Sequence, residues 1–358
     1  MRNNSESQFK ILEDILLEVI SEAELANELS ADTHEEQISD ATNATINEAQ
    51  SILIEELQSR ACYKMLRRER KIIAGFEKRN LKRWKPAFDQ IEILLYATRD
   101  IGGNFSTEFS DSTNSKDNYI FDALVQLHAR GILVAAEAIH LLKGGFPDGA
   151  MTRWRTLHEV LVVSILLSQS SNEISYRYLV HQDISLFKAA SQINKYADDA
   201  NLQSFSDSEM RDIEERKTQV ISELGSKMKD PFGWAAPIFT EKPNTWKANF
   251  LDLEEHVGLD HWRPRYKWAS QHTHAGSRDF RSLLGLEESE KPLLLVGPSN
   301  SGFVNPLQMI ALHLASLTST LLLIRKNLDT VALSNALLAM ARKVSSLAIK
   351  AEEETAKK

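Results

Sequence analysis

Apolar residues recur along this chain at the spacing of helices rather than of strands. Within residues 119–143, Ile120, Phe121, Leu124 and Leu127 return every three or four positions, which places them on or near one face of a helix. Helices are predicted in this way over residues 7–28, 36–80, 86–98, 119–143, 149–170, 173–198, 207–224, 261–276, 305–327 and 329–353. We therefore expect an all-α fold, a multi-helix bundle core with an extended helical N-terminal arm.

Glycine, proline and short polar residues mark the ends of these helices. Gly144-Gly145 ends the helix over 119–143, and Asp148 is a good N-cap for the next helix. Residues 102–115 are rich in Gly, Ser, Asn and Thr and are predicted to form a loop. The apolar run 293–296 is the one predicted strand, and it leads into the turn Gly297–Gly302.

Charge is divided unevenly between two neighbouring segments. Residues 1–60 hold fourteen acids against three bases, net −11, and residues 64–85 hold ten bases against two acids, net +8. The acidic segment can fold back on the basic one or pair with it in a dimer, and the basic segment can instead contact nucleic acid. We place a boundary near residue 85, with a helical arm over 1–84 and a core domain over 85–358.

These segments predict partners as well as domains. We expect a homo-oligomer, most simply a dimer, and a protein partner contacted through residues 1–84. The run 309–324 is shorter than a membrane span of about 20 residues and carries His313, which predicts a buried core helix and no membrane partner. The single Cys62 excludes an internal disulfide, and with no recognisable signal peptide it predicts a cytoplasmic protein.

The densest group of ionisable residues opens the helix over 149–170. Arg155, His158 and Glu159 stand at i, i+3 and i+4 and share a face, and Arg153 precedes His158 by five positions. A histidine can move the proton of an RNA 2′-hydroxyl, and an arginine can hold the scissile phosphate. This spacing fits metal-independent RNA cleavage by His158, Arg153 and Arg155. The alternative is a buried network in which Glu159 pairs with an arginine and His158 is a satisfied core histidine.

Other residues are predicted to support this centre. Tyr178 and His181 are neighbours on one helix, and Ser270 and His274 on another, so both pairs can join His158 inside a bundle. His272 and His274 lack a carboxylate at ligand spacing, so we expect no metal and no cofactor.

A second group mixes bases with aromatic residues, which suits phosphate contact and base stacking. It places Arg263, Arg265 and Lys267 among Trp262, Tyr266 and Trp268, although such aromatic residues more often pack in a core. With Arg79 and Arg83 of the basic segment, these three bases are the predicted nucleic-acid contacts.

Several segments are similar to a bacterial family catalogued as domain-of-unknown-function family 5677, over residues of about 85–330. They are Ala129-Arg130-Gly131, Gly144-Gly145-Phe146-Pro147-Asp148-Gly149-Ala150, Arg153-Trp154-Arg155-Thr156-Leu157-His158-Glu159, Arg177-Tyr178-Leu179-Val180-His181, Ala269-Ser270-Gln271-His272-Thr273-His274 and Gly297-Pro298-Ser299-Asn300-Ser301-Gly302. This family has no established activity. Helical bundles with Arg-x4–6-His also resemble the HEPN superfamily, whose members are often dimeric ribonucleases of toxin and antiphage systems, and this likeness implies catalytic roles for Arg153 and His158.

Three functions follow as hypotheses. The first is a HEPN-like effector that cleaves or binds RNA, in antiphage defence or a toxin system. The second is a non-catalytic binding or assembly module, whose polar centre is structural or holds a small anionic ligand. The third is a hydrolase that uses Ser270 or a metal on His272 and His274.

Overall fold

The computed structural model describes residues 60–112, 118–243, 245–274, 282–291 and 293–356, together with scattered positions between 43 and 58. The chain divides into two compact units, Met1–Phe76 and Glu77–Lys358. Every regular element in the described ranges is an α-helix or a 3₁₀-helix, which confirms the all-α prediction. The predicted helix over 7–28 lies outside the described residues.

The first long helix shows where local sequence signals fail. Helix α3 runs through Arg60–Ser112 without a break at Pro86, and it includes most of the predicted loop 102–115. Around Pro86, the buried Trp84 and Phe88 anchor the helix in the core. Gly102 is needed for close packing, because a Cβ there would lie 2.2 Å from Cε1 of His128 on the next helix. The predicted loop over 102–112 is therefore wrong.

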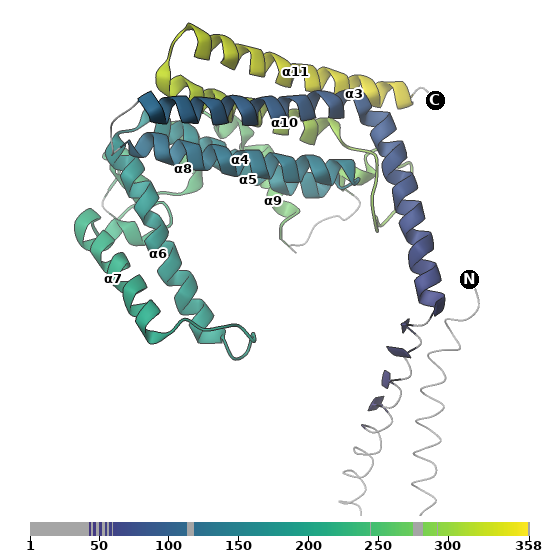
Figure 1. Ribbon diagram of the computed structural model, residues 1–358, viewed down its shortest axis with the longest axis horizontal. Coiled ribbons are helices and arrows are strands. Elements are labelled where there is room, and N and C mark those ends of the chain that lie inside the picture. Colours follow the sequence, from purple (N-terminus) through teal and green to yellow (C-terminus); the bar gives the residue numbers. More distant parts are fainter. Residues whose placement is uncertain are drawn as a thin grey trace, which may run out of the picture. The chain divides into compact units, whose positions relative to one another are not determined.

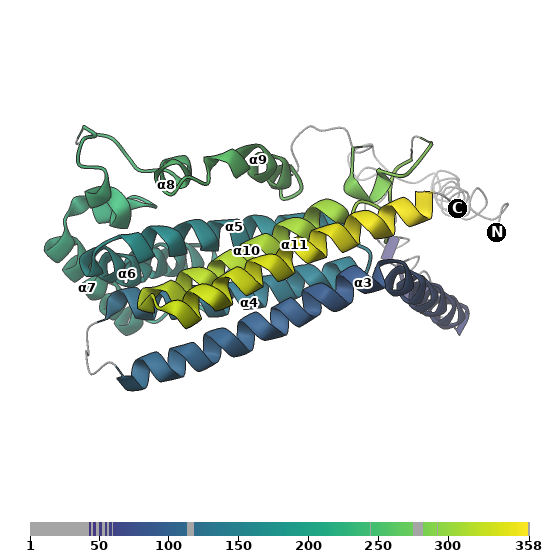
Figure 2. The ribbon, with the colours of Figure 1, turned by 90° about the horizontal axis from the view of Figure 1, so that it is seen from above.

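The second unit is built around one apolar helix. Helix α10 (Val304–Leu322) packs against α4 (Tyr119–Lys143), α5 (Pro147–Gln169) and α11 (Leu328–Ala356). Figures 1 and 2 show these helices side by side, with α10 among them. Buried residues occur all round α10, as expected for a helix that its neighbours enclose.

The elements between α5 and α10 pack on the outside of this bundle. Helices α6 (Asn172–Tyr196) and α7 (Asp207–Leu224) pack together as a hairpin, and α6 contacts α4. The chain then passes through short elements, of which α8 and α9 lie against α5. These elements are η1 (Ser226–Lys229), η2 (Gly233–Ile238), α8 (Phe250–His256), η3 (Asp260–Trp262), α9 (Arg263–Gln271) and η4 (Leu284–Leu286), whereas η5 (Leu323–Arg325) follows α10. This excursion brings distant polar residues onto α5.

The predicted strand 293–296 is wrong. The segment belongs to no regular element, and Leu294 and Val296 are 74% and 96% exposed. A strand needs backbone partners on a neighbouring strand, and the described residues supply none.

The turn that follows is structural. Ser299 donates its backbone N–H to the carbonyl of Gly145, and Trp84 donates its indole N–H to the carbonyl of Asn300. Asp148, predicted as an N-cap, instead accepts hydrogen bonds from the backbone N–H groups of Leu284 and Gly285, and Phe146 occupies the N-cap of α5. These bonds fasten the segment before α10 to the α4–α5 turn.

By length and composition, α4 and α10 are apolar enough to cross a membrane. In the most apolar window of each, 39% and 67% of the residues are buried inside the protein. Core helices pass the same test, and the sequence run 309–324 lies on α10 among its buried residues.

The buried His128 is expected to make the stability of the fold depend on pH. Its Nε2 lies 3.0 Å from Thr318 Oγ1, and burial lowers the pKa of His128 from 6.5 to about 4. The unfolded chain therefore binds this proton at a higher pH than the folded protein. Stability should fall as the pH drops from about 6.5 to about 4, by at most about 1.4 kcal/mol per pH unit.

Urea unfolding at pH 7 and pH 5 measures this effect. We expect His128→Gln, which keeps a polar partner for Thr318 but cannot titrate, to lose less stability than the wild type over this interval. His140→Gln on the exposed side of α4 is the control and should behave as the wild type. Equal losses in all three proteins would remove His128 as the cause.

Candidate functional site

Helix α5 directs its polar residues into two layers. His158 is completely buried, and its ring stacks on that of Trp154 one turn earlier, with the ring centroids 5.5 Å apart. Arg155 and Glu159 are partly exposed, with 26% and 38% of their side chains accessible, and they form an ion pair at 3.1 Å. Of the three residues predicted to share a face of this helix, His158 therefore lies in the interior, and Arg155 and Glu159 lie near the surface.

The inner layer is a hydrogen-bonded chain of four residues. His158 Nδ1 lies 3.0 Å from His313 Nε2 on α10, and His158 Nε2 lies 2.8 Å from Glu254 Oε1 on α8. The other oxygen of Glu254 accepts a hydrogen bond of 2.5 Å from Arg263. His313 Nδ1 lies 2.9 Å from the carbonyl oxygen of Met309.

The hydrogen-bond partners of these four residues show which nitrogen atoms carry protons. A carbonyl oxygen only accepts, so His313 donates from Nδ1 to Met309. Burial, reinforced by the neighbouring His158, holds the pKa of His313 well below its usual value, so His313 is neutral and its Nε2 accepts from His158. Glu254, which also pairs with Arg263, accepts from His158 Nε2. We conclude that His158 donates at both nitrogens and is a buried imidazolium beside a carboxylate.

This arrangement limits what His158 can do. His158 and Glu254 are both fully buried, and both His158 nitrogens already hold partners. A general acid or base must come within hydrogen-bond reach of a substrate atom. The geometry therefore favours a structural role for His158 over proton transfer to RNA.

The outer layer centres on Tyr266 of α9. Its hydroxyl donates to Glu159 Oε1 at 2.6 Å and accepts from Arg155 at 2.9 Å. The guanidinium groups of Arg155 and Arg263 lie over its ring, 4.8 and 5.2 Å from the centroid. Burial, together with the hydrogen bond to Glu159, raises the pKa of Tyr266 to about 12, so the hydroxyl stays protonated at neutral pH.

The other predicted site residues lie in separate contacts. Arg153 pairs with Glu137 on α4 rather than approaching His158. Tyr178 packs edge-on against Trp234, and His181 Nε2 lies 3.0 Å from the backbone oxygen of Asp230. Ser270 donates to the backbone oxygen of Tyr266, and His274 is exposed three residues after the end of α9. The structure brings none of these five into the inner network.

Sequence reasoning missed two members of the network, Glu254 and His313. His313 had a usable signal, because a histidine inside a long apolar run needs a buried polar partner. Glu254 had none, since it follows no motif and reaches His158 only through the fold. Among the described residues, no group of three or more His, Cys, Asp or Glu side chains is placed to hold a metal ion.

Three of the five residues predicted to contact nucleic acid are instead bonded to other residues of this protein. Arg83 binds Glu288 and the carbonyl of Asn300, and only 9% of its side chain is exposed. Arg263 is held by Glu254, and Arg265 donates to Asn305 on α10. Arg79 and Lys267 are exposed, and no hydrogen bond or ion pair joins either to a described residue.

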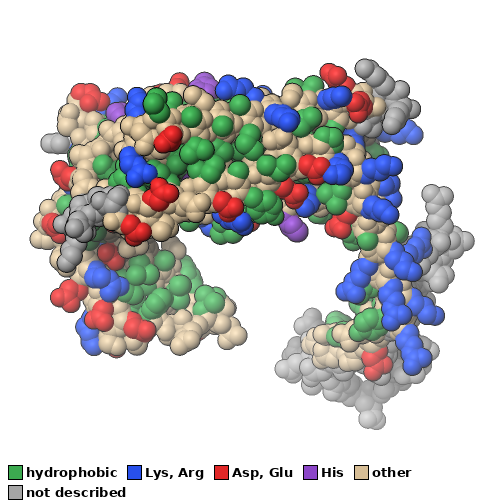
Figure 3. Space-filling view, turned by 45° about the horizontal axis from the view of Figure 1, so that its top comes forward, with side chains coloured by type: hydrophobic (Ala, Val, Ile, Leu, Met, Phe, Trp, Pro, Cys, Tyr) green, Lys and Arg blue, Asp and Glu red, His purple; other side chains and the backbone are tan. Residues whose placement is uncertain are grey.

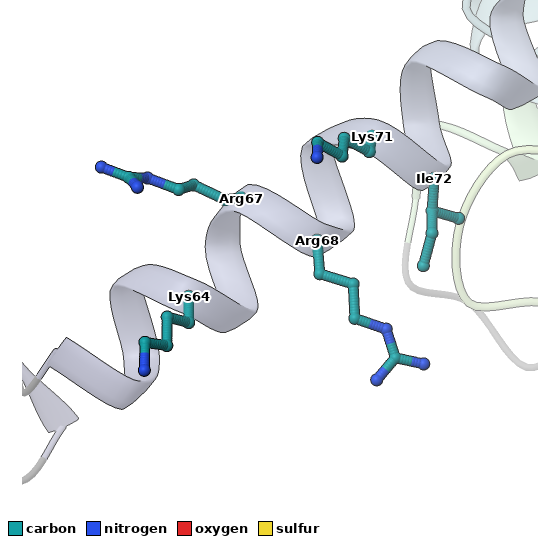
Figure 4. Close-up of a pocket in the computed structure, with 5 residues that line it drawn as sticks. All are labelled: Lys64, Arg67, Arg68, Lys71 and Ile72. Atoms are coloured by element: carbon teal, nitrogen blue, oxygen red, sulfur yellow. The ribbon is translucent and has the colours of Figure 1, made fainter.

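The first unit carries more exposed cations on one helix face than the predicted nucleic-acid contacts provide. Lys64, Arg67, Arg68 and Lys71 stand at i, i+3, i+4 and i+7 of α3, so they share one face over about 10 Å. We call these four residues the basic stripe. Together with Ile72 they line an open hollow of ≈ 410 Å³, and Figure 4 shows the five side chains projecting from this helix. Lys and Arg side chains gather along the same segment in Figure 3.

No described residue pairs with the cations of the basic stripe. All four side chains are exposed, and none forms an ion pair with a described residue. Tyr63, which is 61% exposed, stands next to the stripe on the helix surface. Cations beside an exposed aromatic ring match the chemistry of single-stranded nucleic acid.

These features define an all-α bundle protein with a buried His–Glu–Arg network. Residues 121–292 match a family model described as "Family of unknown function (DUF5677)", in agreement with the resemblance that the motifs predicted. His158, Glu254, Arg263 and Tyr266 lie inside the matched segment. No curated protein and no solved structure matches the chain.

Proposed function

We propose that this protein is a non-catalytic RNA-binding helical protein, in which the basic stripe of α3 contacts the phosphate backbone. The observation that carries the proposal is the set of four exposed cations on one helix face, without ion pairs to described residues. A row of cations along one helix suits a row of phosphates, and each such contact releases counterions from the nucleic acid.

The adjacent Tyr63 favours a single strand over a duplex. A base can stack on an exposed aromatic ring only when it is not already stacked and paired inside a helix. The resemblance to HEPN proteins supports RNA as the natural nucleic acid.

Charge reversal of two stripe residues tests the proposal. Binding of a fluorescein-labelled single-stranded oligoribonucleotide is followed by anisotropy at about 50 mM and about 200 mM salt. We expect Arg67→Glu/Arg68→Glu to bind at least about ten-fold more weakly at the lower salt. It should also flatten the slope of log K against log salt by about 1.4, since a single strand contributes about 0.7 per phosphate contact.

The matched control is Arg342→Glu/Lys343→Glu, two exposed neighbours on α11 that change the net charge by the same amount. It should bind within about two-fold of the wild type if the contact is local to α3. Equal loss in both variants, or no RNA binding at low salt by any of the proteins tested, would overturn the proposal. Binding of anionic lipid vesicles instead of RNA would assign the stripe to a membrane surface.

The same samples separate binding from cleavage. We expect no RNA cutting in EDTA that depends on His158, because that side chain is buried with both nitrogens occupied. Cutting by the wild type that is lost in a folded His158→Gln variant would restore the catalytic hypothesis. A role in antiphage defence or a toxin system, and a cytoplasmic location, are part of this proposal and rest on the HEPN resemblance and the sequence alone.

A further inference from the structure

The part of α3 in the first unit also exposes an apolar surface. Met65, Leu66, Ile72 and Ile73, which we call the apolar stripe, are between 40% and 52% exposed. They repeat after seven residues, the period of a helix that packs against another helix. Helices in water gain most of their stability by burying such a face. The stripe therefore indicates a helical partner.

The chemistry of this surface specifies that partner. On a helix, the apolar stripe and the basic stripe lie on neighbouring sides of residues 60–76, which carry six bases against one acid, net +5. A matching partner is an amphipathic helix with an apolar face flanked by acids. Such a helix would bury the apolar stripe and offer a carboxylate to each exposed cation.

Residues 7–28 of this chain have that pattern. Their apolar residues return every four positions as Ile11-Leu12, Ile15-Leu16 and Val19-Ile20. Asp14, Glu18 and Glu22 share the same four-residue spacing along the flank, and the segment holds six acids against one base, net −5. Its charge is equal and opposite to that of residues 60–76.

The connection between the two segments is long enough for this pairing. Residues 29–59 separate them; a helix over 43–59, where described positions are helical, covers about 25 Å, and residues 29–42 can bridge up to about 46 Å when extended. A helix of the length of 7–28 covers only about 33 Å. The segment can therefore reach residues 60–76 of its own chain.

We propose that the acidic segment 7–28 docks on residues 60–76 of the same chain and covers the basic stripe. This inference concerns the site of the proposed function and rests on it for its consequence, which is competition between the acidic segment and RNA. A protein with the segment docked binds RNA weakly, and release of the segment exposes all four cations at once.

The experiment uses the full chain and two readouts. The test variant is Asp14→Asn/Glu18→Gln/Glu22→Gln, and the matched control is Asp198→Asn/Asp199→Asn/Glu215→Gln, three exposed acids of the second unit. Hydrogen exchange followed by mass spectrometry reports the protection of peptides from 60–76, and anisotropy reports affinity for the labelled oligoribonucleotide.

We expect the test variant to exchange at least about ten-fold faster over 60–76 and to bind RNA at least about ten-fold more tightly, while the control matches the wild type. Unchanged exchange in the test variant would overturn the docking, whatever happens to RNA. Faster exchange with no RNA binding by any protein would leave the docking intact and overturn the proposed function.

Protein concentration distinguishes the two possible sources of the acidic segment. Docking within one chain gives the same protection at every concentration, as we expect here. Protection that rises with concentration would place the segment of a second copy on α3 and overturn the intrachain docking. In that case the predicted dimer would form through this contact.

Discussion

Replacement of His158 by alanine is expected to lower the free energy of unfolding by about 3–5 kcal/mol at neutral pH. His158 is fully buried and bridges His313 to Glu254, so its removal leaves Glu254 with one cation fewer and opens a cavity beside Trp154. Urea unfolding measures this loss. His140→Ala, on an exposed position of α4, is the matched control and should stay within about 0.5 kcal/mol of the wild type.

A double-mutant cycle shows whether the loss comes from the network. We expect His158→Ala and Glu254→Ala each to be strongly destabilising, with the double variant losing clearly less than their sum. The reason is that the second substitution removes a charge that the first had left without its partner. Additive losses, or a His158→Ala variant as stable as the wild type, would contradict the buried imidazolium. A stable variant would also reopen a catalytic role for this histidine.

Gly302→Ala is expected to lower the free energy of unfolding by about 2–5 kcal/mol, the second large effect. Gly302 has φ of +74°, and a Cβ there would lie 2.3 Å from the carbonyl oxygen of Leu284. That oxygen accepts from Ser301, and the N–H of Leu284 is held by Asp148, so Leu284 cannot move without breaking these bonds. The cost combines backbone strain of about 1–2 kcal/mol with steric overlap of about 1–3 kcal/mol.

Gly258→Ala isolates the strain from the overlap. Gly258 has nearly the same φ, +72°, but no atom lies within 4 Å of the position of its Cβ. It should therefore lose only about 1–2 kcal/mol in the same unfolding experiment. Similar losses at both positions would show that the contact with Leu284 adds nothing, and that the turn before α10 is held less firmly than its hydrogen bonds indicate.

Much of the helical structure is readable from local patterns. The predicted ranges 119–143 and 207–224 coincide with α4 and α7, and 149–170 and 173–198 differ from α5 and α6 by one or two residues at each end. In these segments the apolar spacing, the turn residues and the capping residues agree. Where local signals conflicted with packing, as at Pro86 and Gly102 of α3, packing decided the outcome.

The candidate site, too, was predicted only in part from the sequence. The sequence singled out His158, Arg155 and Glu159 and predicted that they share one side of a helix. It also left open a buried network, the alternative that the geometry favours. It did not supply Glu254 and His313, which lie 96 and 155 positions from His158 along the chain. It also grouped Tyr178 and His181 with this centre, whereas the fold holds them against Trp234 and Asp230.

The sequence by itself determined that this protein is helical, where most helices lie, which family part of it resembles, and that an acidic segment precedes a basic one. Each of these depends on residues close together in the chain. Only the tertiary structure decided that α3 continues through Pro86, that 293–296 has no strand partner, and that His158 is buried between Glu254 and His313. Burial and hydrogen-bond partners depend on which distant segments meet, and a spacing of three or four residues carries no information about that.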